Sequence, residues 1–323
     1  MSDISIKFVN FWPTFDIHDN KFVKALNSRH NVTVIPVESS DTPDILFYSR
    51  CGVPVHYDYD CVKVYFTGEN DVPDFNECDY ALSFHDIDFN GHSLRYPLYM
   101  LYEYGQCFNP PALTDRQALD RGFCSLLMRN SNNCDPRRLE IINAVDAYRP
   151  IAYGGPFRNN VGGPVEEKIP FIAKYKFNLA LENTDIEGYV TEKLLEALAA
   201  ATVPVYWGPT AAAIDFNPDA YINVNDYNSL DSMIADLAAI DADPGRYLSI
   251  LRAPNFGADG PIDFDGRLAD FLCVIADNPV RRVARYGETA MLHRRNRLTG
   301  PLWARRTSRA GLRVMSSIFC RKH

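Results

Sequence analysis

Short apolar runs alternate with segments of helical spacing along most of this 323-residue chain. In the first half, the apolar runs cover residues 4–12, 31–37, 44–49, 61–68 and 80–84. In the second half, they cover residues 150–155, 176–183, 202–208 and 220–226. Parallel strands need a long crossover between them, usually a helix, so this alternation predicts parallel sheets with helices on both faces. The expected fold class is therefore α/β.

The chain is long enough for two such sheets, at about 150 residues per domain. We expect two doubly wound, Rossmann-like halves facing a cleft, because ligands of such sheets bind beyond the carboxyl ends of the strands. The apolar rhythm restarts after residue 150, and the proline-containing segment 109–149 is interpreted as a crossover between the halves. The predicted divisions are two domains and a basic tail, at residues 1–150, 151–278 and 279–323.

Charge is distributed unevenly along the chain. Residues 281–323 hold 12 Lys and Arg against one acidic residue, whereas the whole chain has a net charge of −8. Within this tail, Leu312, Met315 and Phe319 lie at helical spacing beside several arginines, which predicts an amphipathic helix on an anionic membrane surface. A disordered basic extension is the alternative. The acidic remainder of the chain argues against nucleic acid as a partner.

Cysteine usage and hydropathy indicate a protein of a reducing compartment. The eight cysteines include no C-x-x-C pair, and no Cys/His group has the spacing of a zinc site. The first residues lack the pattern of a signal peptide, and no run of 18 apolar residues would span a membrane. We therefore expect a cytoplasmic protein with reduced thiols, peripheral on the inner membrane if the tail binds lipid.

One helix start carries a charge of the unfavourable sign. A helix is predicted from about Thr191, with Thr191 as its N-cap, and Lys193 then lies in the first turn. A cation there costs about 0.3–1 kcal/mol. A bound phosphate would reverse the sign of this effect, with an attraction on the order of 4 kcal/mol at 4 Å. The alternatives are a solvated lysine or an ion pair with Glu196.

Two further stretches end in residues suited to binding or catalysis. Arg158 lies in "YGGPFRNNVGG", where glycines permit close approach of a ligand and arginine suits a phosphate. Glu69 directly follows an apolar strand, at the ligand-facing end, where a carboxylate can act as a general base. The alternatives are a flexible surface turn for Arg158 and a solvated turn residue for Glu69.

These stretches, in this order, resemble the bacterial α-1,3/4-fucosyltransferases, inverting transferases of the GT-B fold. The resemblance covers roughly residues 5–276. It is carried by "VYFTGENDVPDFNECDYALSFHDIDFNGHSLRYPLYM" (64–100), similar to the acceptor-domain signature, and by "YKFNLALENTDIEGYVTEKLLEALAAATVPVYWGP" (175–209), similar to the donor-binding motif. "FRNN" and "DFNPDAYINVNDYNSLDSMI" (215–234) also fit. Residues 1–150 would then bind the acceptor, and residues 151–278 the donor, GDP-fucose.

The resemblance implies a role for each matching position of the donor domain. Arg158 and Lys193 match the cations on the diphosphate. Glu192 matches the carboxylate on the nucleotide ribose, and Asn183 and Tyr189 match further donor-contacting positions. The segment after Arg158 departs from the family pattern and lacks an expected tyrosine, so the contacts there do not carry over.

The same resemblance implies the reaction. Glu69 matches the general base that deprotonates the acceptor hydroxyl, and direct displacement would transfer fucose with inversion to an N-acetyllactosamine-type glycan. No metal site in the protein is implied, with Mn²⁺ or Mg²⁺ only as an activator of the diphosphate. The alternatives are a GT-B transferase for another nucleotide sugar and a non-catalytic glycan-binding relative.

Overall fold

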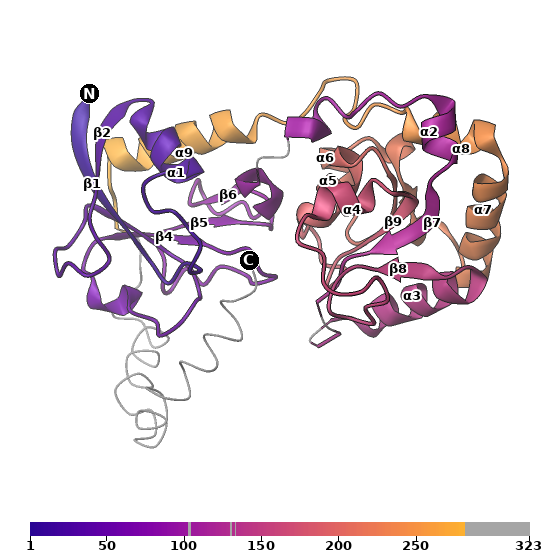
Figure 1. Cartoon of the computed structure of the whole chain (residues 1–323). Coiled ribbons are helices and arrows are strands. Elements are labelled where there is room, and N and C mark those ends of the chain that lie inside the picture. The colour runs from indigo at the N-terminus through magenta and orange to yellow at the C-terminus, as the bar shows by residue number, and fades with distance from the viewer. Residues whose placement is uncertain (103–104, 130, 133, 282–323) are drawn as a thin grey trace, which may run out of the picture. The chain divides into compact units, whose positions relative to one another are not determined.

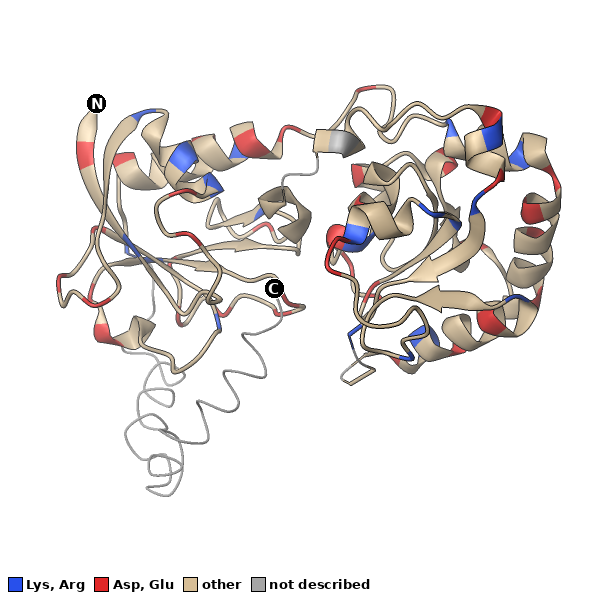
Figure 2. Ribbon diagram, viewed as in Figure 1, with Lys and Arg blue, Asp and Glu red and all other residues tan. Residues whose placement is uncertain are grey.

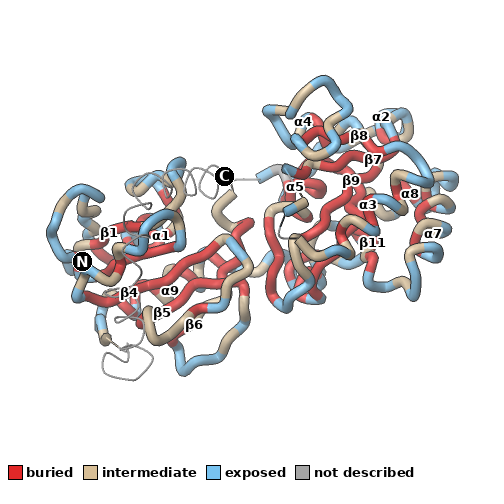
Figure 3. Tube along the Cα trace, turned by 90° about the horizontal axis from the view of Figure 1, so that it is seen from below, coloured by how far each residue is buried: buried red, intermediate tan, exposed pale blue. Residues whose placement is uncertain are grey.

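The computed structural model describes residues 1–102, 105–129, 131–132 and 134–281, which form two compact α/β units (Figure 1). Among the described residues, unit 1 comprises residues 1–96 and 263–281, and unit 2 comprises the residues between 97 and 262. Most strands of both units are buried along most of their length (Figure 3), whereas the two edge strands of unit 1 are only partly buried. Burial on both faces explains why the buried strands are near-continuous apolar runs.

Unit 1 is built on a parallel sheet in the order β2-β1-β3-β4-β5-β6. Its strands are β1 (Ser2–Val9), β2 (His30–Val34), β3 (Ile45–Tyr48), β4 (Val62–Phe66), β5 (Tyr80–Ser83) and β6 (Ser93–Arg95). Helices α1 (Lys21–Asn27) and α9 (Phe264–Asp277) pack against each other on this unit (Figure 1). A 3-10 turn, η1 (His56–Asp58), precedes β4.

Unit 2 is built on a second parallel sheet in the order β11-β10-β9-β7-β8. Its strands are β7 (Gly122–Leu126), β8 (Ile151–Tyr153), β9 (Tyr175–Leu181), β10 (Val203–Trp207) and β11 (Ile222–Asn223). Its helices are α2 (Asp115–Leu119), α3 (Pro136–Tyr148), α4 (Lys168–Ile172), α5 (Glu192–Ala199), α6 (Ala212–Asp215), α7 (Leu230–Ala242) and α8 (Pro244–Leu251). Short 3-10 turns are η2 (Leu98–Leu101), η3 (Gly105–Cys107), η4 (Pro218–Ala220) and η5 (Val224–Asp226).

Helices cover both faces of the second sheet. On one face, α3 and α7 contribute Ile142, Val145 and Leu237 to the main core of the unit. On the other face, α4 and α5 pack on each other and against β9 (Figure 1). The expected fold class of two doubly wound, Rossmann-like α/β units is confirmed.

The interpretation of residues 109–149 as a crossover is wrong, because this segment supplies β7 and α3 to the second sheet unit. Pro136 was one reason for that interpretation. It occupies the first turn of α3 after the N-cap Asp135, whose side chain accepts a hydrogen bond from the Arg137 N–H. Proline is favoured at that position because its missing N–H would have no partner in the helix.

The expected boundaries at residues 150 and 278 also differ from the structure. Unit 2 begins at residue 97, and α9 belongs to unit 1 instead of the second half. Cys273 of α9 packs against Ala25 of α1, and Lys21 pairs with Asp265 across 2.6 Å. These contacts tie the helix to the first sheet. The predicted amphipathic helix of the tail lies outside the described residues.

The sequence order of the strands reverses once in each sheet, between β1 and β3 and between β7 and β9. At such a point the connections leave to opposite sides, which opens a crevice beyond the carboxyl ends of the two strands. In unit 2 this point is lined by the chain following β7 and by Glu182 and Asn183, which follow β9. A ligand of unit 2 is therefore expected at the residues that follow β9.

Candidate functional site

Most charged residues lie on helices and loops (Figure 2), but Glu182 at the end of β9 is fully buried. Its Oε1 accepts a hydrogen bond from the Thr191 N–H at 2.7 Å. Its Oε2 accepts one from the Thr191 hydroxyl at 2.6 Å and one from Lys193 Nζ at 3.0 Å. A buried carboxylate requires such partners because desolvation otherwise costs several kcal/mol. Glu182 thus joins the end of β9 to the start of α5.

Lys193 extends from the first turn of α5 into this group of side chains. Its Nζ lies 2.7 Å from Thr191 Oγ1 and 3.6 Å from Glu192 Oε1, and the side chain keeps 18% of its surface exposed. Burial lowers the pKa of Lys193, but the carboxylates of Glu182 and Glu192 outweigh that effect and raise the pKa well above its ordinary value. Lys193 is therefore a fixed cation.

The start of α5 confirms Thr191 as the N-cap residue but contradicts the alternative in which Lys193 pairs with Glu196. The proposed partner Glu196 is bound by Lys168 of α4 at 2.6 Å, and Lys193 is paired with Glu182 instead. Thr191 is the N-cap residue, but its side chain makes no capping hydrogen bond and donates to Glu182. The amides of the first turn of α5 therefore receive no capping bond from the Thr191 side chain.

Asn183 and Tyr189 lie beside this ion pair and are joined to a second buried cation. Arg138, in the first turn of α3, is 4% exposed, and its Nη1 donates to Asn183 Oδ1 at 2.8 Å. The Asn183 amide nitrogen lies 3.5 Å from the hydroxyl of Tyr189, which is 2% exposed. Burial lowers the pKa of Arg138. The neighbouring Cys134 and Glu182 partly offset this shift.

We call these side chains the β9-edge cluster: Arg138, Glu182, Asn183, Tyr189, Thr191, Glu192 and Lys193. Four of the six residues predicted from the sequence, Asn183, Tyr189, Glu192 and Lys193, are brought together in it. Glu182 and Arg138 were not predicted. Sequence signals could have found both residues. Glu182 directly follows an apolar run, as Glu69 does, and Arg138 is a cation in a first helical turn, as Lys193 is.

Arg158 lies in the loop that follows β8, and its side chain is exposed. The guanidinium stacks over the Phe157 ring at 5.0 Å, and the backbone adopts a φ of +50°. Asn159 and Asn160 fix the loop, because their amide nitrogens donate to the carbonyls of Tyr153 and Ile151 at 3.1 and 2.9 Å. The structure therefore holds Arg158 on an ordered turn.

Gly155, one of the glycines before Arg158, does not serve the expected close approach of a ligand. A Cβ on Gly155 would lie 2.2 Å from the carbonyl oxygen of Met128, which follows β7. The close approach at this glycine is therefore to the chain itself and not to a ligand.

Glu69 lies in unit 1, in the loop after β4, with an exposed side chain. Its N–H donates to Thr67 Oγ1 at 3.0 Å. Two residues later, Asp71 is paired with Arg50 and accepts a hydrogen bond from the Tyr65 hydroxyl at 2.9 Å. Both sides of Glu69 are thus anchored to the sheet while its carboxylate faces solvent.

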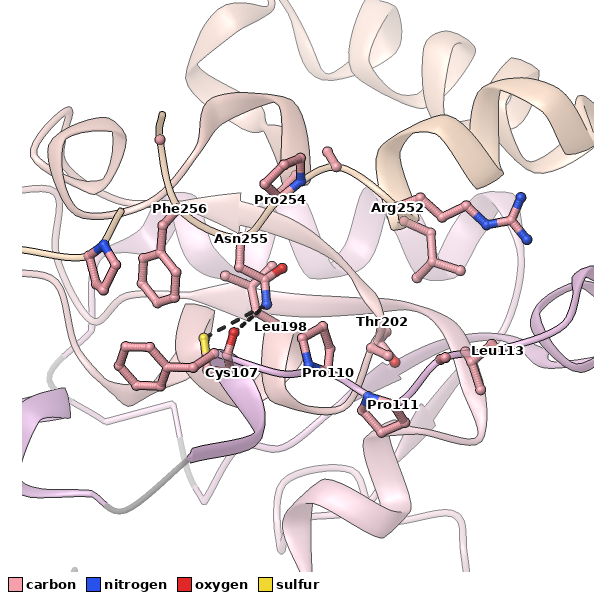
Figure 4. A pocket seen from close by; sticks show the side chains of 18 of the residues that line it. Cys107, Pro110, Pro111, Leu113, Leu198, Thr202, Arg252, Pro254, Asn255 and Phe256 are labelled. Atoms are coloured by element: carbon pink, nitrogen blue, oxygen red, sulfur yellow. Dashed lines mark hydrogen bonds between the residues drawn. The ribbon is translucent and has the colours of Figure 1, made fainter. Parts of the chain in front are cut away.

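A cavity of about 530 Å³ lies in unit 2, and none of its lining residues belongs to the β9-edge cluster. Figure 4 shows the side chains around it. Thr202, immediately before β10, lines it together with apolar residues such as Leu198, Pro111 and Phe256. Asn255 donates to the Cys107 carbonyl across it at 2.7 Å. Because β9 and β10 are parallel, this cavity lies at their amino ends, where the cluster residues are not.

The described residues show neither a metal-binding group nor a membrane span. Among them, no set of three or more His, Cys, Asp or Glu side chains is placed to hold a metal ion. Over the same residues, no helix is long and apolar enough to cross a bilayer.

Family comparisons match both units. Residues 6–102 match the family described as the alpha-(1,3)-fucosyltransferase FucT N-terminal domain, and residues 123–252 match the C-terminal part of glycosyltransferase family 10, the fucosyltransferases. The chain belongs to the fucosyltransferase family. Crystal structures of an alpha1,3-fucosyltransferase with GDP-fucose and with GDP align at a TM-score of 0.74, with 29% and 30% identity, and cover 87% of this chain and 92% of those chains. This match confirms the expected GT-B class.

Two curated fucosyltransferases illustrate the extent of the similarity. Alpha-(1,3)-fucosyltransferase FucT of Helicobacter pylori is 31% identical over 287 residues, which are 77% of this chain and 59% of that enzyme. This chain therefore spans less than two thirds of that relative. A human 3-galactosyl-N-acetylglucosaminide 4-alpha-L-fucosyltransferase is 34% identical over 121 residues, 36% of this chain and 33% of that enzyme.

Proposed function

We propose that this chain is an inverting α-1,3(/4)-fucosyltransferase that uses GDP-β-L-fucose as donor. The observation that carries the proposal is the β9-edge cluster, which places the cation Lys193 at the start of α5, beyond the end of a strand at a switch point. A helix N-terminus with a fixed cation suits a diphosphate. The related crystal structures that hold GDP and GDP-fucose support this choice of nucleotide.

In the proposed complex, the diphosphate contacts Lys193 and Arg158, and Glu192 accepts hydrogen bonds from the ribose hydroxyls. Asn183 and Tyr189 make further contacts with the donor. Lys193 keeps its positive charge because Glu182 and Glu192 surround it. It can therefore stabilise the charge that develops on the leaving diphosphate. A divalent ion such as Mn²⁺ or Mg²⁺ would be carried by the diphosphate as an activator.

Glu69 is proposed as the general base. Its carboxylate takes the proton of the acceptor hydroxyl while that oxygen forms a bond to C1 of fucose. The bond between C1 and the β-phosphate oxygen breaks, and GDP leaves with the bonding electron pair. The configuration at C1 inverts from β to α. An exposed carboxylate on an anchored loop suits this role, because the acceptor can reach it without rearrangement of the sheet.

The proposed acceptor is a Galβ-GlcNAc glycan of the N-acetyllactosamine type, with transfer to the 3-OH or 4-OH of GlcNAc. The name of the human relative, which acts on a 3-galactosyl-N-acetylglucosaminide, supports this class. The reaction is assigned to the cytoplasm, with peripheral membrane contact through the basic tail. Co-sedimentation with anionic liposomes, with and without residues 282–323, tests that contact.

A donor panel tests the reaction itself. The purified chain is incubated with N-acetyllactosamine and GDP-fucose, GDP-mannose or UDP-sugars, and the product and its linkage are determined. We expect an α-linked fucosylated product and free GDP with GDP-fucose only. Turnover of another donor would identify a different GT-B transferase, and glycan binding without release of GDP would identify a non-catalytic relative.

A further inference from the structure

We propose that Arg138 is a positioning residue that sets the orientation of the Asn183 side-chain amide, so that its NH₂ group and not its oxygen faces GDP-fucose. This inference rests on the proposed function, in which Asn183 contacts the donor. Neither the sequence patterns nor the family resemblance drew attention to Arg138.

The chemistry of Arg138 and Asn183 allows only one orientation of the asparagine amide. An asparagine side chain presents one acceptor oxygen and one nitrogen with two donors, and the two ends have nearly the same shape. The guanidinium of Arg138 only donates and stays protonated. At 2.8 Å from Arg138 Nη1, the Asn183 atom must therefore be the oxygen. The reverse orientation would bring two donors together in a buried place.

Asn183 is held at two points by the start of α3. The Asp135 N–H donates to the Asn183 backbone carbonyl at 2.9 Å, and Arg138 holds the side chain. With the oxygen engaged, the amide nitrogen points to the Tyr189 side of the residue, 3.5 Å from that hydroxyl. This distance is at the long limit of a hydrogen bond, so the nitrogen remains able to donate to a ligand.

Among the described residues, Arg138 forms no ion pair that would explain its burial. It is 4% exposed, and its Nε is a buried donor for which the described residues provide no acceptor. Burial of this kind is costly, because a buried unsatisfied donor loses its hydration without replacement. Its neighbour Arg137, in contrast, is paired with Glu140 at 3.0 Å at the surface. The buried Arg138 has a specific contact at Asn183, whereas the half-buried Arg137 contacts Glu140.

The consequence is a specific requirement on the ligand. The Asn183 side chain can only donate to the ligand, so the GDP-fucose atom that it contacts must be an acceptor, such as a phosphate or ribose oxygen of the GDP moiety. An aspartate at position 183 would keep the contact with Arg138 and even strengthen it. It would present an acceptor oxygen and a negative charge to the ligand in place of an N–H.

The experiment measures the Kd of GDP by calorimetry for Arg138→Gln, Asn183→Ala and the double variant. Glutamine can donate or accept, so it no longer forces the amide of Asn183 into one orientation. We expect Arg138→Gln alone to weaken GDP binding about tenfold, in line with the loss of one oriented hydrogen bond to a charged group. In the Asn183→Ala background the same substitution is expected to change the Kd less than twofold, because the two residues act as one unit.

Matched variants keep the test independent of folding. Arg137→Gln is the control on the same helix and is expected to leave the Kd unchanged. Arg138→Lys retains a buried donor and is expected to recover most of the affinity. Asn183→Asp keeps Arg138 in place and should melt no lower than the parent chain, yet bind GDP at least tenfold more weakly.

The outcomes separate this inference from the proposed function. If Arg138→Gln weakens GDP binding equally in both backgrounds, Arg138 does not act through Asn183, and this inference fails alone. Asn183→Asp with unchanged affinity would overturn the assigned orientation in the same way. Unchanged affinity in Asn183→Ala would refute the contact between Asn183 and the donor, which is a failure of the proposed function and of this inference together.

Discussion

Two carboxylates that follow buried strands, Glu182 after β9 and Glu69 after β4, have opposite surroundings. Glu182 is fully buried and accepts hydrogen bonds from Thr191 and Lys193, whereas Glu69 is exposed on an anchored loop. Three hydrogen bonds from this chain already occupy the Glu182 carboxylate, whereas the Glu69 carboxylate is open to an incoming acceptor hydroxyl. The comparison teaches that the same local sequence signal yields a structural anion in one unit and a candidate base in the other.

The substitution with the largest expected effect is Glu69→Gln. Loss of the general base is expected to lower kcat by about 10²–10⁴-fold. The melting temperature and the Kd of GDP-fucose should not change, because Glu69 is exposed and is not part of the β9-edge cluster. Initial rates of GDP release with a saturating acceptor provide the measurement.

Glu38→Gln is the control for that substitution, since Glu38 is an exposed glutamate elsewhere in unit 1. It should retain full activity. Near-full activity of Glu69→Gln would show that Glu69 is not the general base, and Glu69 and Glu182 would then not differ in catalytic role.

Lys193→Ala is expected to have the next largest effect, on both binding and stability. The substitution leaves Glu182 buried without its cation, which is expected to cost about 3–5 kcal/mol of the free energy of unfolding. It should also raise the Kd of GDP, because the fixed cation at the start of α5 is lost. Denaturant unfolding and calorimetry measure the two effects.

The double variant Glu182→Gln/Lys193→Ala separates those two effects. It removes the unpaired charge, so stability should recover most of the loss while GDP binding stays weak. Recovery of GDP affinity together with stability would show that Lys193 serves only to neutralise Glu182.

Arg158→Gly is expected to change binding without a loss of stability. Arg158 is exposed, so its removal should raise the Kd of GDP about tenfold through the loss of one charge-assisted contact. Its φ of +50° suits glycine, and this relief offsets the greater freedom of glycine in the unfolded chain. Arg158→Ala, which keeps the strain, should bind as weakly and melt slightly lower, and equal affinity to the parent chain would contradict the proposed contact.

The smallest expected effect is that of Thr191→Val. The Thr191 hydroxyl donates to Glu182 and lies 2.7 Å from Lys193 Nζ, so its loss should cost about 1–2 kcal/mol of the free energy of unfolding. Thr191→Ser keeps the hydroxyl and serves as the control. A thermal melt of both variants would show equal stability if the hydroxyl contributed nothing.

The features predicted correctly from the sequence are those that depend on residues close together in the chain. The strands around Lys193 and the helix that begins there were predicted, because apolar runs and a helix start are visible within about ten residues. The ion pair between Lys193 and Glu182 was not predicted, since the two are brought together by the turn between β9 and α5. Arg138 was missed because Pro136 was interpreted as a linker residue instead of the first turn of a helix.

The burial of the cations has a consequence for ionic strength. Dissolved salt screens exposed charges over about 10 Å at 0.1 M, but it screens buried pairs much less. Arg158 is exposed, whereas Arg138 is almost fully buried and Lys193 largely so. Added salt should therefore remove only the contribution of Arg158 to GDP binding. Beyond that point the Kd of GDP should stop changing with salt concentration. High salt should therefore weaken GDP binding of the parent chain as much as Arg158→Gly does. The effect is reversible, and the β9-edge cluster stays intact.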